Sequence, residues 1–198
     1  MSAKEQQGRR PRADVQRNRA ALLEAAQRHF LRDGVGTSLE AVAKEAGVGP
    51  ATLYRHFPTR EALLAAVLQT RSEELVARRA EISQLGDASE MLRQWLRAME
   101  EYFSAFSGLP EPLMAAARER EPDNPLTLPC DDLIATTDEY LRAAQLAGRA
   151  RPSVKGYDLF LAAISTAWIS GTGATDEESL SRLRTLIESG YREQDNEV

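Results

Sequence analysis

The segment TSLEAVAKEAGVGPATLYRHF, residues 37–57, predicts two short helices joined by a tight turn. Its first four residues, Thr37 to Glu40, have the S/T-x-x-E form of a capping box, in which a hydroxyl and a carboxylate satisfy free N–H groups at a helix start. Gly47 suits the left-handed residue that closes a helix, and Pro50 fits the first turn of the next, where no backbone donor is needed. We therefore expect the two helices about three residues apart.

The second of these helices, residues 50–57, has two faces of different chemistry. At about 100° per residue, Leu53 and Phe57 lie on one side, where they can pack on neighbouring helices. The opposite arc is small, polar and basic. It is formed by Ala51, Thr52 and Arg55.

This outward arc has the chemistry needed to read DNA. A helix of this kind can enter the major groove, about 12 Å wide, where Arg55 can pair with guanine and Thr52 can reach a base edge or a thymine methyl. Tyr54 and His56 lie on the flanks and are better placed for phosphates at the rim of the groove, although each could instead be an ordinary packing or surface residue. The segment therefore predicts a DNA-binding helix-turn-helix.

The segment and its surroundings resemble the N-terminal signature of the TetR family of regulators, over about residues 15–65. The resemblance is carried by Thr37, Val42-Ala43, Ala46-Gly47-Val48, Leu53-Tyr54, His56-Phe57 and Leu63. It departs from the usual pattern at Gly49, where a serine is commoner, and at Val35, where an aromatic residue is frequent. Loss of the serine removes a possible helix cap and phosphate contact.

The resemblance implies roles for particular residues. Thr37 would touch a phosphate at the start of the first short helix, and Tyr54 and His56 would also hold phosphate. Pro50, Ala51, Thr52 and Arg55 would face the bases, while Arg60 stands where the family usually has a lysine that binds the DNA backbone. The expected DNA-binding set is Thr37, Gly49, Pro50, Ala51, Thr52, Tyr54, Arg55, His56 and Arg60.

Charge is distributed unevenly along the chain. Its net charge is −5, but residues 1–60 contain eleven lysine or arginine residues against six acidic ones, a local charge of +5 that leaves −10 for the rest. A basic module joined to an acidic one suits a head that faces phosphates and a body kept away from them. The alternative is a solvated surface on which charge is merely uneven.

The rest of the 198-residue chain shows helical periodicity and no convincing strand pattern, which predicts an all-α fold. We expect a disordered basic tail over residues 1–13, a three-helix DNA-binding head over residues 14–60, and a larger helical bundle over residues 61–198. Besides the two short helices, the expected helices cover 15–32, 59 to about 85, 88–107, about 113–120, 131–147, 154–170 and 176–190.

The resemblance implies that the body binds a small-molecule effector and forms a homodimer through its last two helices. The bulky candidates for an effector pocket are Trp95, Met99, Tyr102, Phe103, Phe106 and Trp168. An aromatic stripe at helical spacing can equally be plain core. The implied function is a ligand-responsive repressor that binds a palindromic double-stranded operator. A transcriptional activator of the same family is the alternative.

Several classes of protein are disfavoured by what the chain lacks. Cys130 is the only cysteine, and the two histidines, His29 and His56, are scattered, so we expect no metal site, no cofactor and no catalytic constellation. His29 is interpreted as a surface or packing residue. No apolar stretch approaches the roughly 18 to 20 residues that span a bilayer, so we expect a cytoplasmic protein that does not bind membranes. A helical ligand-binding or protein-interaction module without DNA binding remains the alternative to a regulator.

Overall fold

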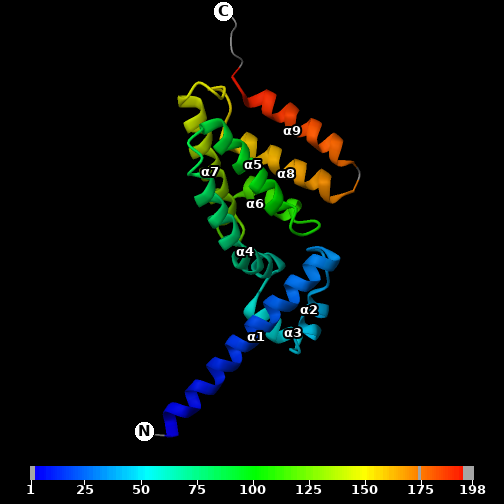
Figure 1. The fold of residues 1–198 in the computed structure, drawn as a ribbon. Helices are drawn as coiled ribbons and strands as arrows, with labels where there is room; N and C mark the ends of the chain where they lie inside the picture. The colour runs from blue at the N-terminus through cyan, green and yellow to red at the C-terminus, as the bar shows by residue number, and fades with distance from the viewer. Residues whose placement is uncertain (1–2, 174, 194–198) are drawn as a thin grey trace, which may run out of the picture. The chain divides into compact units, whose positions relative to one another are not determined.

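A computed structural model describes residues 3–173 and 175–193. Over these residues it contains nine α-helices and no strand; one isolated bridge joins Ala150 to Arg192. The predicted all-α fold is therefore confirmed. The chain divides into two compact units, Met1–Thr70 and Arg71–Val198, which are described separately (Figure 1).

The N-terminal unit consists of α1 (Ala3–Asp33), α2 (Leu39–Glu45), α3 (Pro50–His56) and the first part of α4 (Arg60–Ile82). Helix α2 packs on α1, and α3 packs on α2. Leu22, Ala26 and Phe30 of α1 are fully buried, as their spacing of four residues predicts. Because α2 and α3 have only seven residues each, they depend on this shared core and not on intrinsic helix propensity.

Two backbone features that the sequence predicts are present between α2 and α3. Gly47 has a φ of +70°, in the left-handed region, and Pro50 is the first residue of α3. Gly49 precedes α3 without a side-chain cap, as its lack of a hydroxyl dictates. These features confirm the tight turn between the two short helices.

The predicted capping box is wrong by one residue. Ser38 and not Thr37 caps α2, because its Oγ accepts a hydrogen bond from the Ala41 N–H at 3.3 Å. The Ser38 hydroxyl also donates to Glu40 at 2.7 Å, which lowers the pKa of that carboxyl. Thr37 therefore lies in the turn before the helix, where its hydroxyl contacts His29 instead of capping α2.

Helix α1 begins at Ala3, so residues 3–13 are helical, contrary to the prediction of a disordered tail. Lysine, glutamate, glutamine and arginine predominate there, and all four are strong helix formers that extend a helix without an apolar face. Residues 1 and 2 of the predicted tail lie outside the described residues.

The compact N-terminal unit ends at Thr70, ten residues beyond the boundary that the sequence suggests at residue 60. The start of α4 belongs to this unit because Arg60 donates hydrogen bonds to backbone carbonyls of the α1–α2 turn. Leu63, Leu64 and Val67, which follow Arg60 on α4, are buried. Pro58, which follows α3, therefore lies at the end of a helix but not at the end of the unit.

The C-terminal unit is built around three helices, α5 (Ala88–Phe103), α7 (Thr127–Leu146) and α8 (Gly156–Gly171), which pack on one another. Helix α6 (Pro110–Glu119) packs on α7 and α8, and α9 (Glu177–Tyr191) lies beside α8 (Figure 1). Phe103 of α5 meets Phe160 of α8 edge to face, with 5.5 Å between ring centroids. The Trp95 indole donates a hydrogen bond to Thr137 of α7 at 2.9 Å, so the core satisfies its buried polar group.

No helix in the described part of the chain is long and apolar enough to cross a membrane.

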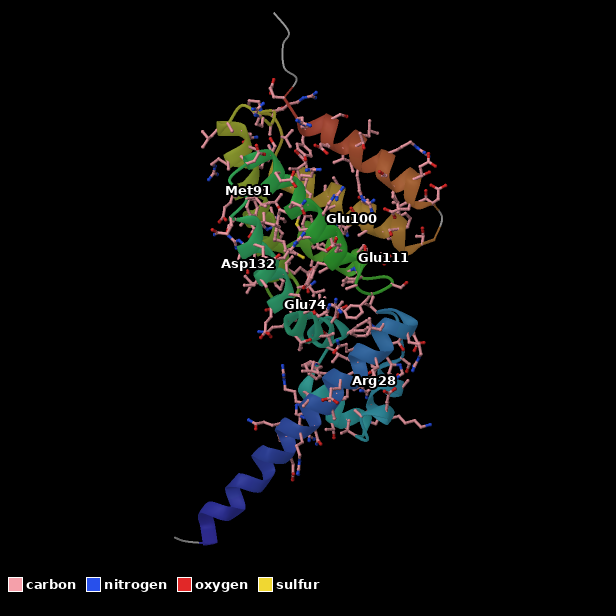
Figure 2. All side chains as sticks on the ribbon, in the orientation of Figure 1. Arg28, Glu74, Met91, Glu100, Glu111 and Asp132 are labelled. Carbon is pink, nitrogen blue, oxygen red and sulfur yellow. The ribbon has the colours of Figure 1, made fainter. Side chains whose placement is uncertain are left out.

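A charged pair ties α9 to α5. Arg184 of α9 donates to both carboxylate oxygens of Glu100, the shortest contact being 2.6 Å, and also donates to Glu177 at 2.6 Å. Glu100, labelled in Figure 2, is 11% exposed at its side chain, whereas Glu177 is 77% exposed. The Glu100 hydrogen bond is the largest cause that raises the pKa of Arg184. The buried Glu100 contact therefore joins α9 to α5, whereas the exposed Glu177 contact lies within α9 itself.

Glu100 and Glu177 allow the buried and the exposed contact of Arg184 to be compared. We expect Glu100→Gln to lower the free energy of unfolding by about 1 to 3 kcal/mol, because Arg184 then lacks its buried counter-charge. Glu177→Gln should change it by less than about 0.5 kcal/mol, because solvent screens the exposed pair. Urea denaturation of the two variants compares them directly, and equal losses would show that burial at Glu100 is unimportant.

Candidate nucleic-acid interface

Helix α3 presents the residues expected to read DNA. Leu53 and Phe57 are 1% and 3% exposed, so the predicted packed face is confirmed. Tyr54 is 43% exposed, Arg55 is also exposed, and Thr52 is half-buried. Of the other predicted residues, Gly49, Pro50 and Ala51 are exposed, and Thr37, His56 and Arg60 are half-buried. The outward face of α3 is therefore accessible, short and weakly basic.

The inner side of this helix is held from α1. The Arg19 guanidinium lies over the Phe57 ring, with 5.4 Å from its central carbon to the ring centroid. A cation over an aromatic face is attracted by the ring quadrupole. Arg19 therefore packs at the end of α3.

The flank of α3 is connected to α2. The Tyr54 hydroxyl lies 3.4 Å from Glu40 Oε1, a long hydrogen bond in which the hydroxyl donates. The hydroxyl has one hydrogen, so it can donate to a phosphate only in place of Glu40, and its exposed position allows that exchange. Without DNA, the contact joins α3 to the first turn of α2.

The turn before α2 is held by side chains from α1 and α4. Thr37 Oγ1 lies 3.3 Å from His29 Nδ1. Arg60 Nη1 donates to the carbonyl of Val35 at 2.6 Å and to that of Thr37 at 2.7 Å. Arg60 thus reaches back along the chain to the turn, a contact that the sequence pattern does not reveal.

His29 is a residue of the head whose environment sequence reasoning missed. It is 5% exposed, and its Nδ1 lies 3.2 Å from Asp33 Oδ2. Its Nε2 lies 2.9 Å from Glu45 Oε2 of α2, although this contact lacks the alignment of a hydrogen bond. The spacing of His29 and Asp33, four residues apart on α1, is the one signal for this cluster in the sequence.

The carboxylates beside His29 are themselves paired with arginines. Arg28 donates to Glu45 at 2.6 Å, and this hydrogen bond is the largest cause that lowers the pKa of Glu45 (Figure 2). Arg32 donates to Asp33 at 2.7 Å and lowers its pKa in the same way. The ends of α1 and α2 are therefore joined by a charged network around a buried imidazole.

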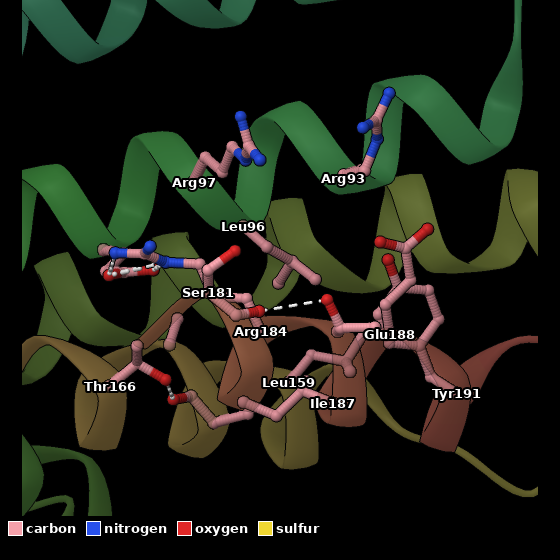
Figure 3. Close-up of a pocket in the computed structure, with 14 residues that line it drawn as sticks. Arg93, Leu96, Arg97, Leu159, Thr166, Ser181, Arg184, Ile187, Glu188 and Tyr191 are labelled. Atoms are coloured by element: carbon pink, nitrogen blue, oxygen red, sulfur yellow. Dashed lines mark hydrogen bonds and ion pairs between the residues drawn. The ribbon is translucent and has the colours of Figure 1, made fainter. Parts of the chain in front are cut away.

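A pocket in the C-terminal unit lies where α5, α8 and α9 meet (Figure 3). It has a volume of about 100 Å³, and the Glu100–Arg184 pair forms part of its wall. Leu159 and Ile187 supply apolar surface, while the guanidinium groups of Arg93 and Arg97 point away from them. Typical ligand sites are several times larger, so this space suits only a very small molecule.

The six residues predicted to bind an effector lie elsewhere in the C-terminal unit. Trp95, Met99, Phe103 and Phe106 are buried. Tyr102 is partly exposed, and burial raises its pKa to about 12. Trp168 is exposed on α8, and its indole donates to Glu111 of α6 at 3.0 Å. None of the six lines the pocket of Figure 3.

Two family models match this chain. The model for "Bacterial regulatory proteins, tetR family" covers residues 22–67. The model for "Transcriptional regulator SbtR-like, C-terminal domain" covers residues 87–193, more than half of the chain. The first match contains α2 and α3, and the second contains α5 to α9.

Individual relatives agree with these models. The TetR transcriptional regulator SCO0520 from Streptomyces coelicolor shares 31% sequence identity in a match that covers 88% of this chain and 98% of that one, with a TM-score of 0.53. The HTH-type transcriptional regulatory protein RaaS from Mycobacterium tuberculosis is 32% identical over 136 residues, 68% of this chain and 60% of RaaS. The HTH-type transcriptional regulator UidR from Escherichia coli is 35% identical over 66 residues, 33% of this chain and 34% of UidR. The matched region thus spans about a third of UidR and less than two thirds of RaaS.

Two short helices, a tight turn at Gly47 and an outward polar face on the second helix define a helix-turn-helix protein. The chain belongs to the TetR family of bacterial regulatory proteins, and it is a helix-turn-helix transcriptional regulator.

The left-handed turn at Gly47 is testable on its own. We expect Gly47→Ala to lower the free energy of unfolding of the N-terminal unit by about 1 to 2 kcal/mol, because a Cβ disfavours this backbone conformation. No atom lies within 4 Å of the added Cβ, so the loss would come from the backbone alone. Gly36→Ala is the control, since it also has open space and lacks a positive φ. Circular dichroism during denaturation should show no loss for Gly36→Ala; equal losses in both variants would contradict the assignment.

Proposed function

We propose that this regulator is a ligand-responsive repressor that binds a palindromic DNA operator as a homodimer and leaves it when a small molecule binds. The proposal depends above all on the packing of α3, which buries Leu53 and leaves Thr52 and Arg55 outward. It acts by binding and not by catalysis, and its place of action is the cytoplasm. DNA binding alone does not distinguish repression from activation, so repression rests on the family.

In the proposed complex, α3 lies in the major groove. Arg55 donates to the acceptor edge of guanine, and Thr52 contacts a neighbouring base. Tyr54, His56 and Thr37 hold the flanking phosphates, which set the position of the helix without reading sequence. Gly49, Pro50 and Ala51 form the small, exposed start of α3, which permits close approach to the DNA.

The proposed dimer interface lies on α8 and α9. Leu186 of α9 is 67% exposed, and a second subunit packed on this helix would cover it. Phe160, Ala163 and Ala167 of α8 are buried within the subunit itself, so the interface must draw on other residues. A dimer with two-fold symmetry places two heads on half-sites about one helical turn, or 34 Å, apart.

The proposed effector binds in the C-terminal unit, with Trp95, Met99, Tyr102, Phe103, Phe106 and Trp168 as its candidate contacts. The burial of four of them, Trp95, Met99, Phe103 and Phe106, supports an apolar environment for such a ligand. Helix α4 contains the boundary between the two units, at Thr70 and Arg71, and is the proposed route by which binding affects the head. The effector must bind the DNA-free state more tightly, since only differential affinity shifts the equilibrium.

The DNA-reading role of α3 is tested by Arg55→Ala. We expect it to weaken binding to a duplex from the region around the regulator's own gene by about 1 to 3 kcal/mol and to relax preference at one base pair. Arg118→Ala is the control: it removes the same charge from an exposed position on α6, in the C-terminal unit, and should leave affinity unchanged. Fluorescence anisotropy with fragments that vary base by base measures both effects. A uniform loss over all sequences would instead assign Arg55 to phosphate.

A further inference from the structure

The turn between α1 and α2 is fixed by an unusual contact from α4. Arg60 Nη1 donates two hydrogen bonds, to the carbonyl oxygens of Val35 and Thr37 at 2.6 and 2.7 Å. The Thr37 N–H closes the turn by donating to the Gly34 carbonyl at 3.2 Å. This one guanidinium nitrogen therefore donates both of its hydrogens to the protein's own backbone.

The two hydrogen bonds from Arg60 are of a strong kind, because their donor is charged. A charged donor gives shorter and stronger hydrogen bonds than a neutral one, and the two carbonyls belong to a turn that has no helix ladder to satisfy them. Val35 is buried, so its carbonyl lies close to the core of the head. The contact also explains how α4 holds the start of α2, although the two are separated in the sequence by α3.

The same turn is held from the other side. His29 of α1 is buried, and its Nδ1 lies 3.3 Å from the Thr37 hydroxyl. Arg32 Nη2 and Asp33 Oδ2 lie 3.0 and 3.2 Å from the same nitrogen, which can form a hydrogen bond with one of these three neighbours at a time. Thr37 is thus positioned through its carbonyl by Arg60 and through its side chain by His29.

We propose that Arg60 is a positioning residue for DNA binding: it sets Thr37 and the start of α2 for a phosphate, and it does not itself bind the phosphate. This inference rests on the proposed DNA-binding function. It departs from what family resemblance implies for this position, where a lysine usually binds the DNA backbone. Two observations support this departure: Arg60 is half-buried, and its Nη1 donates both hydrogens to Val35 and Thr37, which leaves only Nε and Nη2 as donors.

The two roles predict different responses to salt. A cation that binds phosphate releases a counterion, and its removal lowers the slope of log affinity against log salt concentration by about 0.9. A residue that positions a neutral hydroxyl releases none. We therefore expect Arg60→Ala to weaken binding about tenfold while the salt slope stays within about 0.3 of the unsubstituted value.

The roles also differ in how Arg60 couples to Thr37. If Arg60 affects DNA affinity only by positioning the Thr37 hydroxyl, it should contribute little to affinity once that hydroxyl has been removed. In a Thr37→Ala background, Arg60→Ala should then weaken DNA binding by less than about twofold. Independent contacts with DNA would instead give losses that multiply.

Anisotropy titrations of the full chain against the duplex used for Arg55 measure both quantities, with thermal melts to show that each variant is folded. Arg60→Lys serves if Arg60→Ala does not fold, because it keeps the charge but lacks the planar fork and its reach. The proposal requires Arg60→Lys to weaken binding at an unchanged salt slope. A lysine variant that binds normally, a slope reduced by about one, or multiplying losses would overturn it. If the unsubstituted protein binds no DNA, the proposed function fails first, and the role of Arg60 fails with it.

Discussion

The burial of Leu53 and Phe57 is the constraint on which the DNA-binding head depends. A seven-residue helix is not stable alone, so α3 exists because these two side chains reach the core shared with α1 and α2. Their burial also decides which residues face outward, since the helical repeat places Thr52 and Arg55 away from them. Stability and recognition are therefore set by the same packing.

Charged side chains complete the head around that core. The carboxylates of Asp33 and Glu45 each pair with an arginine and flank His29, and Arg60 holds the turn before α2. Contacts of this kind contribute modestly to stability where they are exposed, but they restrict geometry. In the C-terminal unit the Glu100–Arg184 pair has the same effect on α9. The Arg28–Glu45 and Arg184–Glu100 pairs each join two helices.

Local signals in the sequence predicted the helices, the turn at Gly47 and the packed face of α3, because each depends on neighbours within a few residues. The sequence places the cap one residue early because Thr37 and Ser38 are both favoured N-cap residues, and the extended backbone at Ser38 decides between them. The contacts of His29 and Arg60 depend on residues far apart in sequence, which periodicity cannot bring together. The small pocket at α5, α8 and α9 was missed for the same reason, since it has no local pattern.

The central claim is that α3 reads DNA, and footprinting on genomic fragments tests it most directly. The account predicts a short protected site with two symmetric halves about 34 Å apart, with protection that falls steeply as salt rises. This result would identify site, spacing and symmetry together. Absence of any protected site at low salt would contradict the account, because the outward face of α3 would then have no DNA to read.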